Sequence, residues 1–351
     1  MEHIWWGRVP NAMAFSLDIV HLLLDERSLV LHYSSGIPWR DYLIANIKEQ
    51  VMQQNSSKRF EMIEHIDNPG KYLLKKLCKS EKRAQYRPTK SYALFFAESD
   101  DIVLHERYFW VTVDSADNLK AWEDFVSDYI IGRSKGKEKA AFILEWRGEK
   151  PNRSRKGIHV VSLEDYISDY DRIVFSTLAA SSIKGKPFIK QYLTELTSAV
   201  VGNDIELAAE CLKEYQSFLI DAYSCVKKAS FEKVRSDGQE YEFSKSQEDV
   251  TRCVWMAQIK TIYPMLEKFR GEFVEQHASV IAKELPITSS CGEIYDSPAD
   301  VELGTLVYMA GIGRLQLQNK EYKQLERFKN ARNSLSHLNV LTYDEVRALN
   351  L

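Results

Sequence analysis

Six residues near the C-terminus, Arg332-Asn333-Ser334-Leu335-Ser336-His337, form the most compact set of reactive side chains in this chain. Cleavage of RNA through its 2′-hydroxyl needs a base for the hydroxyl proton and an acid for the leaving oxygen, and a histidine can serve as either near neutral pH. An arginine binds phosphate and stabilises charge in the transition state. Asn333 could orient the imidazole or contact phosphate. The segment therefore predicts a metal-free RNA-cleaving site made of Arg332, Asn333 and His337.

The spacing of arginine and histidine does not by itself single out this segment, because three other pairs in the chain have a similar spacing. Its context does, since Asn333 follows the arginine directly and the segment ends a predicted amphipathic helix. Asn333 and His337 share one helix face, whereas Arg332 lies about 140° around an ideal helix from His337. A homodimer in which two such segments face each other would assemble Arg and His from both protomers. The other three pairs are Arg27 with His32, Arg153 with His159, and Arg270 with His277.

Two acidic residues upstream, Asp300 and Glu302, are predicted to support the site by positioning Arg332. The alternative for the whole segment is structural. Polar and basic side chains at the end of a helix can bind the last carbonyl groups and close a bundle. The residues alone leave the catalytic and the structural interpretation open.

The half of the chain that carries this segment is predicted to be all helical, with no strand after Pro187. Apolar residues recur there with helical spacing. Pro264 lies inside the longest stretch and predicts a kink or two separate helices. The predicted helices are Lys190–Val201, Asp204–Val234, Ser246–Glu284, Asp300–Leu317 and Glu321–His337.

The first half alternates apolar, strand-like runs with amphipathic stretches, which predicts an α/β domain with a mostly parallel sheet. Several strands are almost continuously apolar, as expected when both faces of a sheet are covered. The predicted strands are Ser28–Ser34, Phe60–Ile66, Ala93–Ala97, Tyr108–Val113, Ala140–Trp146 and Arg172–Ser176. The predicted helices are Asn11–Asp25, Arg40–Gln53, Pro69–Lys79, Ala116–Ile131 and Leu163–Asp169.

A parallel sheet with helical crossovers suggests a nucleotide site, but the sequence lacks the residues that hold phosphate. The pattern GxxxxGK[ST], whose backbone amides and lysine cradle phosphates, does not occur. The segment Ser34–Arg40, which follows the first predicted strand, has one glycine and a proline that removes an amide. Asp114 and Glu145 lie at strand ends, where acids can hold a metal–nucleotide complex. Without the cradle, we expect no cofactor and no NTPase activity.

One loop is strongly basic and could contact nucleic acid through phosphate groups. The same composition is typical of a solvated surface loop, and the sequence favours neither interpretation. The basic residues are Arg147, Lys150, Arg153, Arg155 and Lys156.

The composition of the 351-residue chain is that of a globular protein, with 44% hydrophobic residues and a formal net charge of -3. A surface that binds nucleic acid must therefore be local. The five cysteines have neither metal-site spacing nor the pattern of a disulfide framework, so no metal is expected. No charged-then-apolar leader and no apolar run near 18 residues is found. We expect a soluble, cytoplasmic protein without a membrane partner.

Through Arg332, Asn333 and His337, the C-terminal part resembles the HEPN family, whose motif is Arg, a polar residue that is commonly Asn or His, three further residues and His. The resemblance covers roughly residues 245–351. It implies a four- or five-helix bundle that often dimerises, and active members cut RNA without metal, often in antiviral defence or toxin systems. Other members bind partners and cut nothing.

By its order of elements, the first part resembles a P-loop NTPase of the AAA or STAND kind that has lost its catalytic motifs, over roughly residues 10–185. Three parts are thus predicted: a degenerate NTPase-like α/β domain (1–186), a helical linker or lid (187–245) and a HEPN-like bundle (246–351). The resemblances imply an endoribonuclease or toxin-like effector in prokaryotic antiviral defence, with the first domain as sensor or regulator. The alternative is a non-catalytic adaptor that scaffolds a multi-subunit defence complex.

Overall fold

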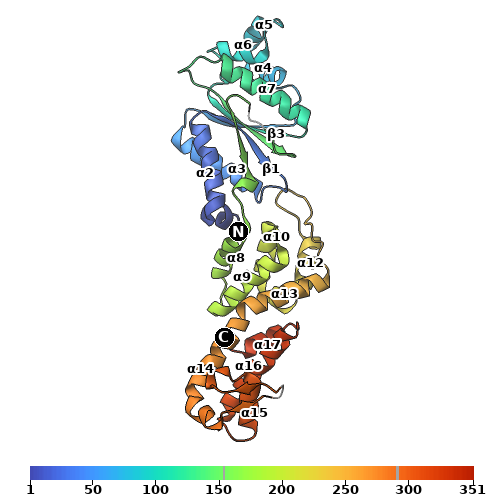
Figure 1. Ribbon diagram of the computed structural model, residues 1–351. Coiled ribbons are helices and arrows are strands. Elements are labelled where there is room, and N and C mark those ends of the chain that lie inside the picture. The colour runs from blue at the N-terminus through green and yellow to red at the C-terminus, as the bar shows by residue number, and fades with distance from the viewer. Residues whose placement is uncertain (153–154, 290–291) are drawn as a thin grey trace. The chain divides into compact units, whose positions relative to one another are not determined.

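The computed structural model describes residues 1–152, 155–289 and 292–351. The chain divides into two compact units, unit 1 (Met1–Asp171) and unit 2 (Arg172–Leu351). Figure 1 shows a sheet with helices on both sides in unit 1 and mainly helices in unit 2. This confirms the predicted fold class, an α/β part followed by a helical region. The finer division of the chain at residues 186 and 245 stays a prediction.

Unit 1 is built on five parallel strands in the order β2-β3-β4-β1-β5. The central strands β3 and β4 are buried along nearly their whole length, because helices cover both faces of the sheet. The edge strand β2 is mostly exposed or half-buried. The strands are β1 (Ser28–Tyr33), β2 (Arg59–Glu64), β3 (Arg107–Val113), β4 (Ala141–Arg147) and β5 (Ile158–Ser162).

The helices of unit 1 form two layers, with α2 and α3 on one side of the sheet and α4, α6 and α7 on the other (Figure 1). Large aromatic side chains fill the core, among them Trp110, Trp122 and Phe142. The helices are α1 (Glu2–Arg8), α2 (Pro10–Leu24), α3 (Arg40–Gln54), α4 (Pro69–Leu77), α5 (Ser80–Gln85), α6 (Tyr92–Glu98) and α7 (Ala116–Gly132), with a 3-10 turn, η1 (Leu163–Asp165).

The predicted strand Ala93–Ala97 is wrong, because this run lies inside helix α6. The side chain of Ser91 accepts a hydrogen bond from the backbone N–H of Leu94 and so caps the start of the helix. A short apolar run has no periodicity that separates a buried strand from a buried helix. The capping serine was the local signal that could have decided it.

Two further predictions fail where unit 1 ends. Arg172–Ser176 lies in helix α8 (Asp169–Ser181), not in a strand. Near the start of that helix, the Asp171 carboxylate accepts hydrogen bonds from the backbone N–H and the hydroxyl of Ser168. The fifth strand is instead Ile158–Ser162, which the sequence did not predict. The predicted helix Leu163–Asp169 is reduced to the 3-10 turn η1.

Unit 2 is mainly helical, and the predicted break at Pro264 is confirmed as a boundary between two helices, α13 and α14. The predicted single helix Asp204–Val234 is three helices, which are interrupted at Glu214 and at Asp221, where the Asp221 side chain caps the start of the third. The helices are α9 (Pro187–Val201), α10 (Ile205–Lys213), α11 (Tyr215–Ile220), α12 (Ala222–Glu232), α13 (Gln247–Thr261), α14 (Tyr263–Ile281), α15 (Leu303–Gly311), α16 (Asn319–Ser336) and α17 (Tyr343–Ala348), with 3-10 turns η2 (Ala282–Glu284) and η3 (Pro298–Asp300).

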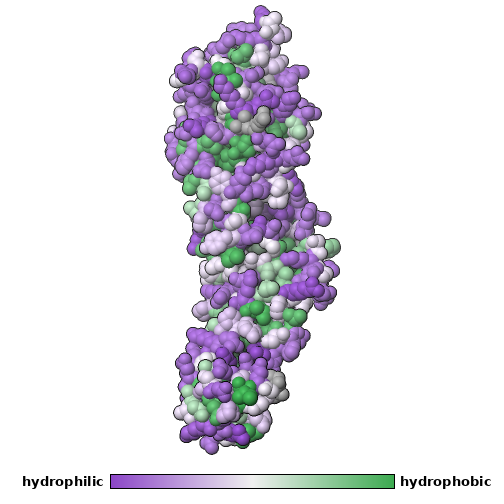
Figure 2. Space-filling view, in the orientation of Figure 1, coloured by the Kyte–Doolittle hydropathy of each residue, from purple (hydrophilic) through white to green (hydrophobic). Residues whose placement is uncertain are grey.

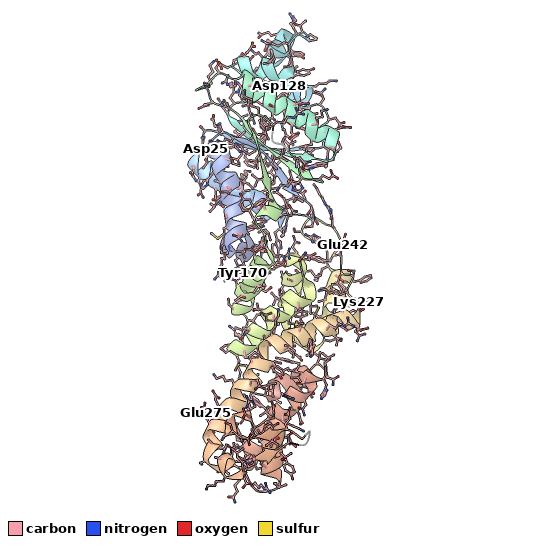
Figure 3. All side chains as sticks on the ribbon, in the orientation of Figure 1. Asp25, Asp128, Tyr170, Lys227, Glu242 and Glu275 are labelled. Carbon is pink, nitrogen blue, oxygen red and sulfur yellow. The ribbon has the colours of Figure 1, made fainter. Side chains whose placement is uncertain are left out.

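The expectation of no strand after Pro187 is wrong in one place. A small antiparallel pair, β6 (Ile287–Thr288) and β7 (Ile294–Tyr295), lies in unit 2. Exposed charged side chains such as Lys227 on α12 and Glu275 on α14 project from the helices (Figure 3). Within the described residues, no helix is both long enough and apolar enough to cross a membrane.

Candidate functional site

The histidine of the candidate site lies at the end of helix α16, as predicted, and its side chain is exposed. The helix ends in a Schellman motif, in which the N–H of Asn339 bonds the carbonyl of Ser334 and the N–H of Leu338 bonds the carbonyl of Leu335. The backbone N–H of His337 donates to the carbonyls of Asn333 and Ser334. Across the described part of the chain, its imidazole has no hydrogen-bond partner, so it is open to a ligand.

Arg332 is half-buried and contacts Glu302, one of the two acidic residues that the sequence suggested as its support. The guanidinium Nη2 lies 3.2 Å from the Glu302 carboxylate. Its Nε is buried and has no hydrogen-bond partner among the residues that the structure describes. Asp300 is exposed in the turn η3, and no contact with Arg332 is present within the described residues. Glu302 therefore orients the arginine. The catalytic role of Arg332, Asn333 and His337 stays a prediction.

Asn333 is half-buried, and its backbone carbonyl accepts the N–H of His337. Arg332 turns toward the start of α15, where Glu302 is the N-cap residue. The residues at 332 and 337 are separated by about 140° around the helix. The structure thus brings Arg332 together with Glu302, but shows no contact between Arg332 and His337 among the described residues.

An apolar depression of about 430 Å³ lies beside the end of α16. Trp255 and Met256 of α13 line it together with Leu338, which is 70% exposed. The Trp255 indole N–H donates to the carbonyl of Leu335, 2.9 Å away, and ties α13 to the last turn of α16. Arg252 also lines the depression and is paired with Glu248. His337 therefore follows a helix end that is held in place, next to an exposed apolar surface.

In unit 1, protein carboxylates bind residues of the segment that follows β1, where a phosphate-binding loop would be expected from the sequence. After β1, the backbone N–H and the hydroxyl of Ser34 donate to Glu164, both at 2.6 Å. Burial raises the pKa of Glu164, but the hydrogen bonds from Ser34 outweigh it and leave that pKa below its ordinary value. The indole N–H of Trp6 holds the same loop by donating to the carbonyl of Pro38. The backbone N–H of Ser34, which follows β1 where such groups bind phosphate in other proteins, is thus already engaged.

The first residue of α3, Arg40, binds Glu145 of β4 through two hydrogen bonds of 2.6 Å. The Glu145 side chain is fully buried and also accepts hydrogen bonds from Trp110 and Tyr33. Burial lowers the pKa of Arg40, but the hydrogen bonds and charge of Glu145 outweigh it and raise that pKa. The Nη2 atom of Arg40 also donates a hydrogen bond to the Thr112 hydroxyl, 3.2 Å away. Glu145 is therefore part of a closed internal network.

The other predicted strand-end acid, Asp114, is about half-exposed and contacts His65 at 3.4 Å. A hydrogen bond from Asn118 lowers the pKa of Asp114. Asp114 and Glu145 thus have separate partners. In the ranges that the structure describes, no group of three His, Cys, Asp or Glu side chains is arranged to hold a metal ion.

Two basic residues of the loop after β4 form ion pairs within unit 1. Lys150 pairs with Asp165 at 2.6 Å, and Arg155 pairs with Asp124 at 2.7 Å. Lys156 is exposed, and Arg147 ends β4. Arg153 lies outside the described residues. Contact of this basic loop with nucleic acid stays a prediction.

The chain matches no family model and no curated protein. Among solved structures, it matches a chain in the structure of Drosophila ORC bound to DNA, with 12% identity and a TM-score of 0.31. The match covers 98% of this chain and 86% of that chain. At this TM-score the likeness carries no argument about fold or function.

Proposed function

We propose that the chain is a metal-independent endoribonuclease of the HEPN type, acting as an effector in prokaryotic antiviral defence with unit 1 as its sensor or regulator. The observation that carries this proposal is the exposed imidazole of His337 at the end of α16. Of the three other histidines that follow an arginine at similar spacing, His32 and His277 are instead bound internally, whereas His159 is exposed but lies on strand β5 and not at a helix end. An open imidazole can exchange protons with a substrate, whereas an internally bonded one is already committed.

The chemistry divides between two side chains. His337 would take the 2′-hydroxyl proton or protonate the leaving oxygen, and Arg332, oriented by Glu302, would bind the scissile phosphate. Since no contact between Arg332 and His337 is present among the described residues, we propose a homodimer in which each site takes its arginine from one protomer and its histidine from the other. An isologous interface between two copies of α16 would create two such sites.

Subunit mixing tests this arrangement directly. The variants Arg332→Ala and His337→Ala should each be inactive in RNA cleavage alone. After mixing and subunit exchange, half of the dimers contain one copy of each variant and hence one complete site of two. Activity should return to about a quarter of the unmutated level.

The control is Lys329→Ala, on the same helix, which should leave cleavage unchanged because Lys329 is not part of the proposed site. RNA cleavage that persists in His337→Ala would refute the catalytic role. Failure of the mixed variants to regain activity, with both single variants dead, would refute the composite site alone. Cleavage is read from a labelled RNA on a denaturing gel, with chelator present.

A second candidate, a non-catalytic adaptor of a defence complex, is supported by the apolar side chains that unit 2 exposes. Phe231 is 90% exposed, Ile220 71% and Leu338 70%. A contiguous exposed apolar surface is typical of sites that bind proteins, and Leu338 lies with Trp255 and Met256 on the apolar depression beside α16. In this case Phe231→Ser should release a co-purifying partner, while Arg332→Ala and His337→Ala should leave the complex intact. Co-purification followed by size-exclusion chromatography separates the two candidates.

A further inference from the structure

The segment from residue 71 to residue 90 in unit 1 is strongly basic, although the chain as a whole has a net charge of -3. It has eight basic residues and one acidic residue, Glu81. It covers most of α4, all of α5 and the chain that leads toward α6. Figure 2 shows a mainly hydrophilic surface at this end of unit 1. The basic residues are Lys71, Lys75, Lys76, Lys79, Lys82, Arg83, Arg87 and Lys90.

Three of the eight cations have acidic partners. Lys76 pairs with Glu61 at 2.9 Å, Lys82 pairs with Asp101 at 2.8 Å, and Lys90 pairs with Glu98. The other five are exposed and form no ion pair with any described residue; we call them the basic face. They are Lys71, Lys75, Lys79, Arg83 and Arg87.

Helix α4 explains why the lysines point outward. Its buried side consists of Pro69, Gly70 and Leu73, which pack on the core of unit 1. Lys71 and Lys75 are four positions apart and therefore lie one above the other on a common, exposed side of the helix. Two like charges at this spacing repel each other. An anionic ligand would remove that repulsion.

Aromatic and backbone contacts hold this surface together. A Cβ atom at Gly70 would collide with the side chain of Tyr92, so the absence of a side chain lets α4 lie directly on α6. Tyr92 stacks on Tyr86, which follows α5, with ring centroids 4.3 Å apart. The guanidinium of Arg87 donates to the carbonyls of Ala84 and Tyr86. The cations are therefore carried on a packed set of helices.

The basic loop after β4 offers a comparison within the same unit. There, Lys150 and Arg155 are both paired with carboxylates. Binding of an anion at that loop would have to compete with these pairs. At the basic face, no described carboxylate has to be displaced, although the Arg87 guanidinium also donates to two backbone carbonyls.

We propose that the basic face binds the phosphate backbone of single-stranded RNA without reading its sequence. Lysine ammonium groups act on phosphate as point charges. Tyr86 and Tyr92 stack on each other, so one face of each ring is covered. The choice of RNA rests on the proposed ribonuclease function, because a chain of net negative charge needs a local basic surface to capture its substrate. The affinity for phosphate rests on the charges alone.

The test measures RNA affinity against salt in the full chain carrying His337→Ala, so that cleavage does not interfere. Each neutralised phosphate contributes about -0.7 to the slope of log affinity against log salt for a single strand. Lys71→Gln, Lys75→Gln and Lys79→Gln together should make the slope about 2 units less steep. Between roughly 50 and 200 mM salt, the affinity of this variant should therefore fall by a factor about 20 times smaller than that of the unmutated chain. Fluorescence anisotropy with labelled oligo(U) and oligo(A) of about 20 nucleotides provides the readout.

A matched control makes the same change in net charge elsewhere on unit 1. Lys48→Gln, Lys120→Gln and Lys135→Gln remove three exposed lysines, and the slope should stay at the unmutated value. Thermal unfolding of both triple variants checks that each is folded. Equal slopes for the two triple variants, no RNA binding, or binding to an acidic protein alone would overturn the inference.

The two proposals fail in different ways. Binding that depends on the basic face, without His337-dependent cleavage, supports the RNA surface and rejects the nuclease. Cleavage that depends on His337, with equal RNA affinity for the two triple variants, rejects the surface and leaves the nuclease standing.

Discussion

Replacing Arg40 with alanine should destabilise unit 1 strongly, because it leaves the Glu145 carboxylate buried without its cation. The Glu145 side chain has no exposed surface, and Arg40 supplies two of the hydrogen bonds that it accepts. Removing one partner of a buried ion pair typically costs about 3–5 kcal/mol, since the remaining charge is neither solvated nor paired. We expect a loss in this range in the free energy of unfolding of unit 1.

A double-mutant cycle isolates the charge from the packing. Glu145→Gln alone should cost about 1–3 kcal/mol, because its amide faces donors at Arg40 and Trp110. The double variant Arg40→Ala with Glu145→Gln has no buried charge and keeps one carbonyl acceptor. We expect it to be more stable than Arg40→Ala alone, with a coupling energy of about 2 kcal/mol or more.

Urea unfolding of the intact chain, monitored by tryptophan fluorescence, measures these changes in the free energy of unfolding. Six of the seven tryptophans lie in unit 1, and the remaining one is Trp255, so the signal reports mainly on the sheet. A loss below about 1 kcal/mol in Arg40→Ala, the value of a surface pair, would refute a buried network. Additive losses in the double variant would refute the charge explanation.

Two further outcomes are expected in unit 2. The neighbouring Cys211 thiol lowers the pKa of Cys225; iodoacetamide at pH 7 should therefore modify Cys225 faster than Cys253, which is also half-buried, and Cys211→Ala should reduce the difference in peptide mass spectrometry. Leu338 has φ of 62°, a left-handed conformation that glycine adopts without strain, so Leu338→Gly should stabilise unit 2 by about 0.5–1 kcal/mol in thermal unfolding. Equal alkylation rates, or a lower melting temperature, would contradict these two predictions respectively.

The elements that periodicity defines well were predicted from sequence, and those that depend on distant contacts were not. Long amphipathic helices and the buried strands β1, β3 and β4 have patterns that hold over many residues. Ala93–Ala97 and Arg172–Ser176 are short apolar runs whose state is decided by a capping side chain or by the packing of a long helix. Strand β5 is short and exposed in part, so its pairing with β1 decides its conformation.

The candidate site shows the same limit. The position of His337 at a helix end was predicted from the helical spacing of the apolar residues that precede it. The contact between Arg332 and Glu302 was suggested but could not be derived, since 30 positions separate the two residues. Arg40 and Glu145 are 105 positions apart, and their pair was not foreseen. Only the fold brings such residues together.

The carboxylates of Glu164 and Glu145 also bear on how reversible the loss of a phosphate cradle would be. If an ancestor bound nucleotide here, a return would require the Ser34 amide and the Arg40 guanidinium to exchange a protein carboxylate for phosphate. Replacing either carboxylate alone leaves the other to repel phosphate and, at Glu145, also breaks a buried pair. Replacing Glu145 thus lowers stability before any binding is gained. A phosphate site at these residues would therefore need both carboxylates to be replaced together.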